Sequence, residues 1–387
     1  MARALRTPGR TAQAGLERHP ASAQADTQLR VLHVIEAFGS GTYEVVRILS
    51  NGLAERDMQV AVAHGHRPET PTDARGGFDP RVELVDVGWE RRNPAIHART
   101  AVRISRLIRD WRPDVVHLHS SFAGVVGAAS RSFGHPVVYT PHAYAFMMPT
   151  RGAAQRAALR GAEWLVARRV DVIGAISQSE ARTAARELRA RNVRCVPNGI
   201  PELDEPRGVH AAPTTTQPLV VAMGRMEAQQ LPHETIRILS ALRPGVDVAW
   251  IGAPVPGSDG ERAVREAGIP CTGWLPRADA LDHLGHATAY LHWTAWDGFP
   301  LSILEAVARN VVVVARDLDV TRELLGPQSV CTTEAEAVGL VSRLVGDPEF
   351  RQATADDQRT RLSQFGAQRM VDGWLAIYGE MLGRASS

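Results

Sequence analysis

Short apolar runs alternate with amphipathic segments along the first half of the chain. The amphipathic segments include residues 95–111 and a stretch around 45–53, where apolar side chains recur at the spacing of a helix. Strands that alternate with helices of this length are typical of a parallel, doubly wound α/β sheet. The apolar runs that we expect to form its strands are 29–38, 59–64, 82–87, 114–119, 136–140, 170–175 and 193–196.

The same alternation starts again after a proline-rich interruption. Residues 201–218 contain four prolines, three consecutive threonines and several acids, and we place a linker at 206–218. We therefore expect two Rossmann-like domains, at 29–205 and 219–368, and a terminal helix within 369–387. In the second domain the expected strands are 219–223, 246–251, 289–293 and 311–315, and the expected helices lie near 236–242, 261–267 and 301–308.

Composition agrees with a globular protein of two domains. The 387 residues suffice for two cores, and 44% hydrophobic with 22% charged residues is a water-soluble composition. The sequence has no apolar run long enough to span a membrane, and its three widely spaced cysteines indicate a reducing compartment. Residues 1–28 are rich in Arg, Ala and Thr without an apolar segment, which excludes a secretory signal. We interpret them as a disordered leader or a misplaced start codon, and we expect a cytoplasmic protein.

Charge is distributed unevenly between the two halves. All 44 basic residues are arginines; residues 1–200 carry 28 of them against 18 acids, and residues 201–387 carry 16 against 24. The halves therefore have net charges of +10 and −8, which sum to the overall +2. Two explanations of this charge asymmetry remain open. One is contact of the basic half with anionic lipid or with a lipid-linked pyrophosphate acceptor. The other is G+C-rich codon usage together with a basic leader. Nucleic-acid binding is disfavoured, because aromatic residues total only 5% and no basic run is interleaved with them.

The richest candidate site is the segment 296–306, which reads Trp-Asp-Gly-Phe-Pro-Leu-Ser-Ile-Leu-Glu-Ala. Pro300 suits the first position of a helix, so the pattern predicts a strand, a loop and then a helix. The free amides and the dipole at such a helix N-terminus attract phosphate. Asp297 and Glu305 flank that position, and carboxylates accept hydrogen bonds from the paired hydroxyls of a ribose or a sugar. The segment therefore predicts a nucleotide-sugar pocket.

This segment resembles the E-x7-E signature of glycosyltransferase family 4, with Asp297 in place of the first glutamate. The Val-Pro-Asn-Gly-Ile of 196–200 and the strand followed by Gly224 and Arg225 are similar to further motifs of that family. The resemblance covers about residues 29–383. It implies a GT-B fold and a retaining transferase with neither a metal nor a cofactor. It also implies that the terminal helix packs back on the N-terminal domain.

The resemblance assigns roles to individual residues. Asp297 would bind hydroxyls of the donor sugar, Glu305 the ribose and Arg225 the diphosphate. The amides of Phe299 to Leu301 would stabilise leaving-group charge. The full expected donor site comprises Gly39, Gly41, Gly224, Arg225, Gly298, Phe299, Pro300, Leu301, Ser302 and Glu305.

Three histidines and one glycine loop are candidates on the N-terminal side. His142 follows the strand 136–140 at the sheet edge where α/β proteins bind ligands, and we expect it to support the donor sugar. Alternation points His117 and His119 to one face of their strand, where they either line the acceptor side of the cleft or pack in the core. The Gly39-Ser40-Gly41 loop permits close approach of a ligand but lacks the dinucleotide fingerprint, because Glu44 occupies the third glycine position.

Some features depart from the family pattern or carry weaker signals. The family places a lysine five residues after the motif arginine, where this chain has Gln230, and no lysine exists elsewhere to replace it. We expect Trp274 to pack in a core, and we do not expect Asp317 and Asp319 to bind a metal. The arginine-rich segment 150–170 reads as a surface helix, with membrane contact as the alternative.

The sequence thus predicts a retaining glycosyltransferase with His142, Asp297 and Arg225 as its catalytic residues. The donor would be a UDP-, GDP- or dTDP-sugar, and the acceptor a sugar or lipid-linked hydroxyl in polysaccharide or lipid-linked glycan synthesis. Peripheral contact with the inner face of the plasma membrane is part of this expectation. A catalytically impaired nucleotide-sugar-binding subunit and a GT-B nucleotide-sugar epimerase remain alternatives.

Overall fold

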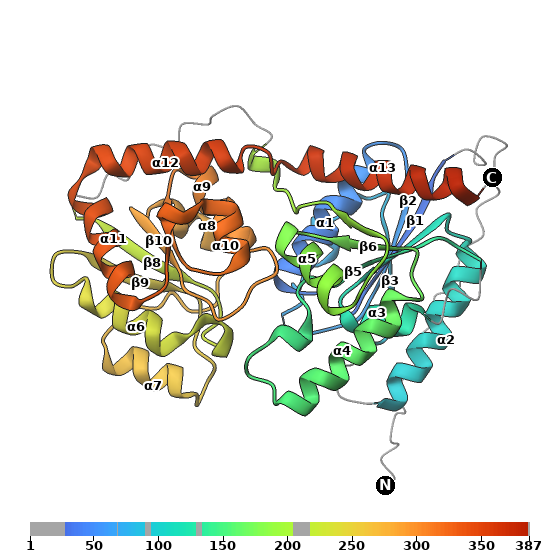
Figure 1. Cartoon of the computed structure of the whole chain (residues 1–387), viewed down its shortest axis with the longest axis horizontal. Coiled ribbons are helices and arrows are strands. Elements are labelled where there is room, and N and C mark those ends of the chain that lie inside the picture. The colour runs from blue at the N-terminus through green and yellow to red at the C-terminus, as the bar shows by residue number, and fades with distance from the viewer. Residues whose placement is uncertain (1–27, 68, 90–93, 129–133, 204–216, 386–387) are drawn as a thin grey trace, which may run out of the picture.

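Two parallel sheets, each with helices on both faces, form two lobes that lie side by side (Figure 1). The computed structural model describes residues 28–67, 69–89, 94–128, 134–203 and 217–385. The leader expected at 1–28 and the linker expected at 206–218 lie almost wholly outside the described residues. The two doubly wound sheets confirm the fold class predicted from the sequence.

The N-terminal lobe has a seven-stranded sheet in the order β3-β2-β1-β4-β5-β6-β7, with every described pair parallel. Its strands are nearly continuous apolar runs, because both faces of the sheet are covered by helices. The strands are β1 (Arg30–Ile35), β2 (Gln59–His64), β3 (Glu83–Asp86), β4 (Val115–His119), β5 (Val137–Thr140), β6 (Val172–Ala175) and β7 (Val193–Cys195). The helices are α1 (Ser40–Ala54), α2 (Pro94–Trp111), α3 (Ser121–Ala128), α4 (Ala153–Ala167) and α5 (Gln178–Glu187).

The C-terminal lobe has a five-stranded parallel sheet in the order β12-β11-β10-β8-β9. Helices α6, α7 and α11 cover one face, while α8, α9, α10 and α12 cover the other. The strands are β8 (Leu219–Met223), β9 (Asp247–Ile251), β10 (Ala289–His292), β11 (Val312–Arg316) and β12 (Val330–Cys331). The helices are α6 (Pro232–Ala241), α7 (Asp259–Glu266), α8 (Arg277–Gly285), α9 (Leu301–Ala308), α10 (Asp319–Leu325), α11 (Glu334–Gly346) and α12 (Pro348–Leu362).

The last helix, α13 (Ala367–Ala385), leaves the C-terminal lobe and lies along the N-terminal lobe (Figure 1). It packs against α1, and the two helices approach so closely that a Cβ at Gly52 would lie 2.5 Å from a methyl carbon of Val371. A glycine inside a helix costs about 0.5–1 kcal/mol relative to alanine. Here that cost is offset by close helix packing, which brings Trp374 and Tyr378 into the N-terminal core.

Candidate functional site

The carboxyl ends of both sheets border one cavity of about 690 Å³ between the lobes. Each sheet reverses its strand order next to this cavity, between β1 and β4 in one lobe and between β8 and β10 in the other. Open α/β sheets bind ligands at such reversal points. The predicted site residues that line the cavity are Gly39, Gly41, His142, Gly224, Arg225, Asp297, Gly298, Phe299, Pro300, Leu301 and Ser302.

Asp297 is held in place by buried polar side chains from the end of β10. One carboxylate oxygen of Asp297 lies 3.4 Å from Nε2 of His292, which is itself only 3% exposed. Nδ1 of His292 contacts the Tyr290 hydroxyl at 2.9 Å, and that hydroxyl lies 3.0 Å from the hydroxyl of Ser302 on α9. The strand and the helix therefore fix the loop that carries Asp297 from both sides.

Helix α9 presents its N-terminus to the same cavity. Pro300 precedes the helix in an extended conformation, and Leu301 is the first helical residue. The first amides of a helix have no partner within the helix and carry its positive dipole end. Because Leu301 and Ser302, the first two residues of α9, line the cavity, a phosphate there can reach their amides.

Arg225 projects from the loop after β8 and already has two acidic partners. Its guanidinium lies 2.6 Å from a carboxylate oxygen of Glu69, in the N-terminal lobe, and 2.9 Å from one of Glu227. Burial alone would raise the pKa of Glu69, but the hydrogen bond and charge of Arg225 outweigh it and hold that pKa below its ordinary value. Gln230 lines the cavity next to Gly224, at the position of the family lysine. The only arginine among the predicted donor-site residues is therefore paired with two carboxylates.

The two lobes are in close contact where Gly298 meets the loop of His142. A Cβ at Gly298 would lie 2.9 Å from the backbone nitrogen of Ala143, so only glycine fits this approach. His142 and Ala143 both adopt positive φ angles, of 53° and 81°, which are uncommon for residues with a side chain. The carboxylate of Glu180 accepts a hydrogen bond from the Ala143 amide at 2.8 Å. This loop thus places the His142 ring in the cavity wall beside the Asp297 segment.

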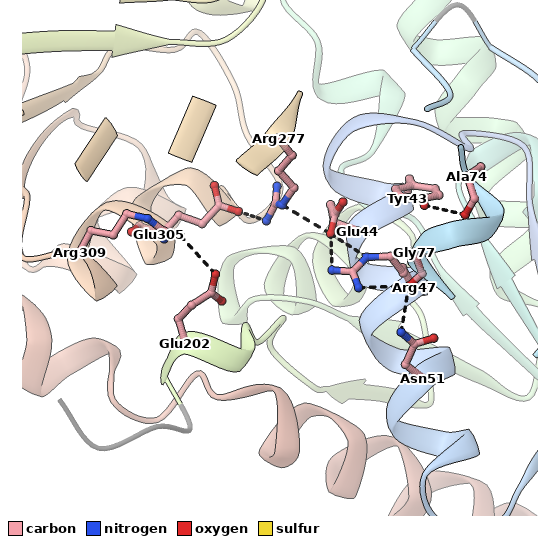
Figure 2. A network of polar contacts seen from close by, with 10 residues as sticks. All are labelled: Tyr43, Glu44, Arg47, Asn51, Ala74, Gly77, Glu202, Arg277, Glu305 and Arg309. Carbon is pink, nitrogen blue, oxygen red and sulfur yellow. Dashed lines mark hydrogen bonds and ion pairs between the residues drawn. The ribbon is translucent and has the colours of Figure 1, made fainter. Parts of the chain in front are cut away.

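Glu305 lies beneath the cavity wall rather than in it. The residue is 1% exposed, and its carboxylate is bonded to the guanidinium of Arg277, the first residue of α8. Burial raises the pKa of Glu305, and the charge and hydrogen bond of Arg277 counteract that rise. Nε of Arg277 also lies 3.6 Å from the carboxylate of Glu44 on α1, which is bonded to Arg47 (Figure 2). The carboxylate expected to bind ribose therefore takes part in a polar network that joins the two lobes.

Comparison with known proteins now decides the family. Residues 39–202 match the model of Glycosyltransferase Family 4, and residues 217–346 match that of Glycosyl transferases group 1. The chain belongs to glycosyltransferase family 4. This family 4 glycosyltransferase is 26% identical over 305 residues to a protein named glycogen synthase from Mycobacterium tuberculosis, with 72% of each chain covered.

Solved structures of GT-B glycosyltransferases share the fold of this family 4 glycosyltransferase. A sucrose-phosphate synthase from Thermosynechococcus elongatus superposes with a TM-score of 0.79 at 15% identity, covering 92% of this chain and 100% of the other. HepE of Anabaena, solved in complex with UDP-glucose, superposes with a TM-score of 0.71 at 17% identity, covering 92% and 100%. At these identities the likeness concerns the fold alone.

In the described part of the chain, no helix has the length and apolar character needed to cross a membrane.

His117 and His119 of the enzyme belong to the core and do not line the cavity. The ring of His117 is enclosed between the hydroxyls of Tyr378 and Thr140, at 2.7 and 2.8 Å. His119 is 1% exposed and contacts Nε2 of His142 through its own Nδ1 at 2.9 Å. The expectation that they line the acceptor side of the cleft was wrong, and core packing was the right alternative. The reason is that α13 covers this face of β4.

Trp274 was also misplaced by the sequence interpretation. The indole is 62% exposed and lines the cavity, with the Arg225 guanidinium 5.7 Å from its ring centre. A tryptophan in an apolar-looking segment favours burial, but here it stands on the loop between α7 and α8. Asp317, for its part, is bonded to Arg322 on the surface.

Sequence reasoning missed three residues that shape the site: Glu69, Arg277 and His292. A local signal existed only for His292, because a histidine at the carboxyl end of a strand beside the Asp297 motif lies at the ligand edge. Glu69 and Arg277 act across the space between the lobes, and no pattern along the chain relates them to their partners.

Proposed function

We propose that this family 4 glycosyltransferase transfers a sugar from a nucleoside diphosphate donor to a hydroxyl acceptor with retention of anomeric configuration. The observation that carries the proposal is the cavity between the lobes, where Asp297, Arg225, His142 and the N-terminus of α9 converge. These groups have the chemistry that a nucleotide sugar requires: a cation and amides for the diphosphate, and a carboxylate and an imidazole for sugar hydroxyls.

Each group has one role in this proposal. Arg225 and the amides of Phe299 and Leu301 hold the diphosphate and stabilise the charge that develops on it. Asp297, oriented by His292, accepts hydrogen bonds from sugar hydroxyls. Glu305 accepts hydrogen bonds from the ribose hydroxyls. Because its carboxylate is bonded to Arg277, the ribose either shares that carboxylate with Arg277 or displaces Arg277 from it.

Retention follows from attack on the face from which the diphosphate departs. The acceptor oxygen forms its bond to the anomeric carbon as the bond from that carbon to the phosphate oxygen breaks. The acceptor proton passes to the departing phosphate oxygen, so no enzymic nucleophile or base is consumed. Preorganised donors around the leaving group supply the main stabilisation in such a step.

The experiment incubates the enzyme with a panel of UDP-, GDP- and dTDP-sugars and a panel of sugar and lipid-linked hydroxyl acceptors. It measures nucleoside diphosphate release and, by NMR, the anomeric proton of the glycosylated acceptor. HepE was solved with UDP-glucose, so that donor is tested first. We expect release from at least one donor, with the donor's anomeric configuration kept in the product. Binding without release favours the impaired subunit, and an acceptor-free change in donor stereochemistry favours the epimerase; either result would overturn the proposal.

We further propose that the N-terminal lobe contacts an anionic membrane through α4 and its neighbours. Trp164 and Leu165 on α4 are 38% and 55% exposed, and Val125 on the adjoining α3 is 53% exposed. Arginines accompany them on the same helix, including exposed Arg156. Exposed apolar side chains next to cationic ones are typical of a surface that binds anionic lipid.

Vesicle co-sedimentation tests this contact. We expect Leu165→Ser to weaken binding to vesicles that contain phosphatidylglycerol. Val255→Ser, at an exposed apolar position in the C-terminal lobe, is the control and should leave binding unchanged. Equal binding to neutral and anionic vesicles, or no effect of Leu165→Ser, would contradict a cationic docking surface.

A further inference from the structure

A row of hydrogen-bonded imidazoles runs from the cavity wall into the core of the N-terminal lobe. Nε2 of His142 lies 2.9 Å from Nδ1 of His119, and Nε2 of His119 lies 3.0 Å from Nδ1 of His33. His33 and His119 are 0% and 1% exposed. The innermost nitrogen, Nε2 of His33, is buried without a hydrogen-bond partner in the described structure.

We propose that His33 and His119 are positioning residues that fix the proton of His142 on Nδ1, so that His142 presents an N–H donor to the ligand. The proposal rests on the function proposed above, because the ligand that receives this hydrogen bond is the donor sugar or its diphosphate.

The three rings are neutral, so each carries one proton. Burial lowers the pKa of His33 and of His142 to about 3. Burial likewise lowers the pKa of His119 well below its ordinary value, and the neighbouring histidines His117 and His33 lower it further. A neutral imidazole has one donor nitrogen and one acceptor nitrogen, so the bonds of the row must all run in one direction.

Only two arrangements satisfy both hydrogen bonds. In one, Nδ1 of His33 donates to His119 and Nδ1 of His119 donates to His142, which leaves His142 protonated on Nδ1. In the other, every bond is reversed and His33 must carry a proton on its buried Nε2. That proton would have no acceptor among the described residues.

The unpartnered nitrogen of His33 decides between them. Orphaned buried N–H groups are rarer in proteins than under-satisfied acceptors. The first arrangement leaves only an unused lone pair at the buried end, so it is the favoured one. The consequence at the cavity is a fixed donor on His142, which suits the negative charge that develops as the diphosphate departs, whereas a lone pair would oppose it.

The arrangement is tested directly by long-range ¹H–¹⁵N correlation spectra of enzyme labelled with ¹⁵N-histidine, which report the nitrogen that carries each proton. Signals are assigned by single variants that each remove one ring. We expect His33, His119 and His142 all to be neutral and protonated on Nδ1, without ligand and at pH 7. A proton on Nε2 of His142, or a mixture of both forms, would overturn the proposal.

Variants of His33 supply a second reading. His33→Leu removes the N–H that donates to His119, so His142 should populate both tautomers. The kcat should fall by about twofold or more, because many molecules then lack the N–H on Nδ1 of His142. The KM for the nucleotide sugar should change little. His33→Asn keeps an amide N–H near the position of Nδ1 and should restore the wild-type spectrum. His117→Asn is the control, because His117 bonds to Tyr378 and Thr140 and not to the row.

Two further outcomes are distinguishable. Ring nitrogens of His33, His117 and His119 lie within 4.8 Å of one another, so the purified enzyme is also analysed for bound metal. Stoichiometric zinc that shifts all three rings would overturn the proposal, because lone pairs would then point at the ion. The tautomer spectrum needs no substrate, so failure of the proposed transferase activity leaves its result intact, and the reverse also holds.

Discussion

Glu69→Gln should tighten the binding of a nucleoside diphosphate. Glu69 holds the Arg225 guanidinium at 2.6 Å, and both side chains line the cavity that we propose binds the diphosphate. A bound diphosphate must therefore displace Glu69 or share Arg225 with it. The glutamine has the same shape, but it removes the negative charge that competes for Arg225.

The magnitude follows from the exposure of the pair. The side chains of Glu69 and Arg225 are 19% and 30% exposed, so their contact lies between a surface ion pair, at about 0–1 kcal/mol, and a desolvated one, at about 1.5–3 kcal/mol. We take about 1 to 1.5 kcal/mol as the free energy that the diphosphate spends on breaking the Glu69–Arg225 pair in the wild type. Removing this cost in Glu69→Gln corresponds to roughly a fivefold to tenfold gain in affinity. The gain should shrink as salt is added, because the competing charge is only partly buried.

Isothermal titration calorimetry with the nucleoside diphosphate and with the free nucleoside measures this change. The nucleoside should bind to Glu69→Gln as it does to the wild type, because it lacks the charged group. Glu227→Gln is the matched control: its contact with Arg225 is longer, at 2.9 Å, and its side chain is 50% exposed. Its effect should therefore be smaller. Unchanged or weaker diphosphate binding by Glu69→Gln would refute the reasoning and would assign Glu69 a direct contact with the ligand.

Three further predictions concern other groups. Gln230→Lys should tighten diphosphate binding at low salt by up to about 1–2 kcal/mol in calorimetry, since it adds a cation at the cavity wall; no gain would show that another group fills that role. Asp297→Ala should lower turnover more than affinity for the free nucleoside diphosphate, because its partner is the sugar; equal losses in both assays would contradict this division. The free energy of unfolding, from urea titrations, should fall as the pH drops from 6.5. His33 and His142, with pKa values near 3 in the folded state, stay neutral there, while their unfolded counterparts take up protons below about 6.5. Glu180, with a folded pKa of about 7, acts in the opposite sense down to about 4.5. It is outnumbered by the buried histidines, because burial also lowers the pKa of His117 and His119 well below the ordinary value; a flat or rising stability would contradict the prediction.

Local sequence patterns were sufficient to predict the strands and helices that border the cavity. The helix expected at 301–308 has those bounds in the structure, and the strand expected at 59–64 does as well. Both are determined by residues close in sequence: a proline at a helix start, and an apolar run between turns. The cavity lining around Asp297 followed for the same reason, because one strand, loop and helix supply most of it.

Long-range packing decided what the sequence could not. Alternation correctly put His117 and His119 on one face, but whether that face borders the cavity or the core depends on α13, which begins about 250 residues later. The pairing of Glu305 with Arg277, and of Arg225 with Glu69, likewise depends on how the lobes meet. Such contacts have no periodicity along the chain, so pattern reasoning has nothing from which to infer them.

The central claim is that a nucleotide sugar binds in the cavity between the lobes. Calorimetric titration of the wild-type enzyme with UDP-, GDP- and dTDP-sugars, repeated with Arg225→Ala, tests it most directly. We predict that at least one donor binds at one site per chain, and that Arg225→Ala weakens this binding together with that of the matching nucleoside diphosphate, while the free nucleoside is unaffected. If no nucleotide sugar binds to the wild type, or if binding is the same in Arg225→Ala, the account is contradicted.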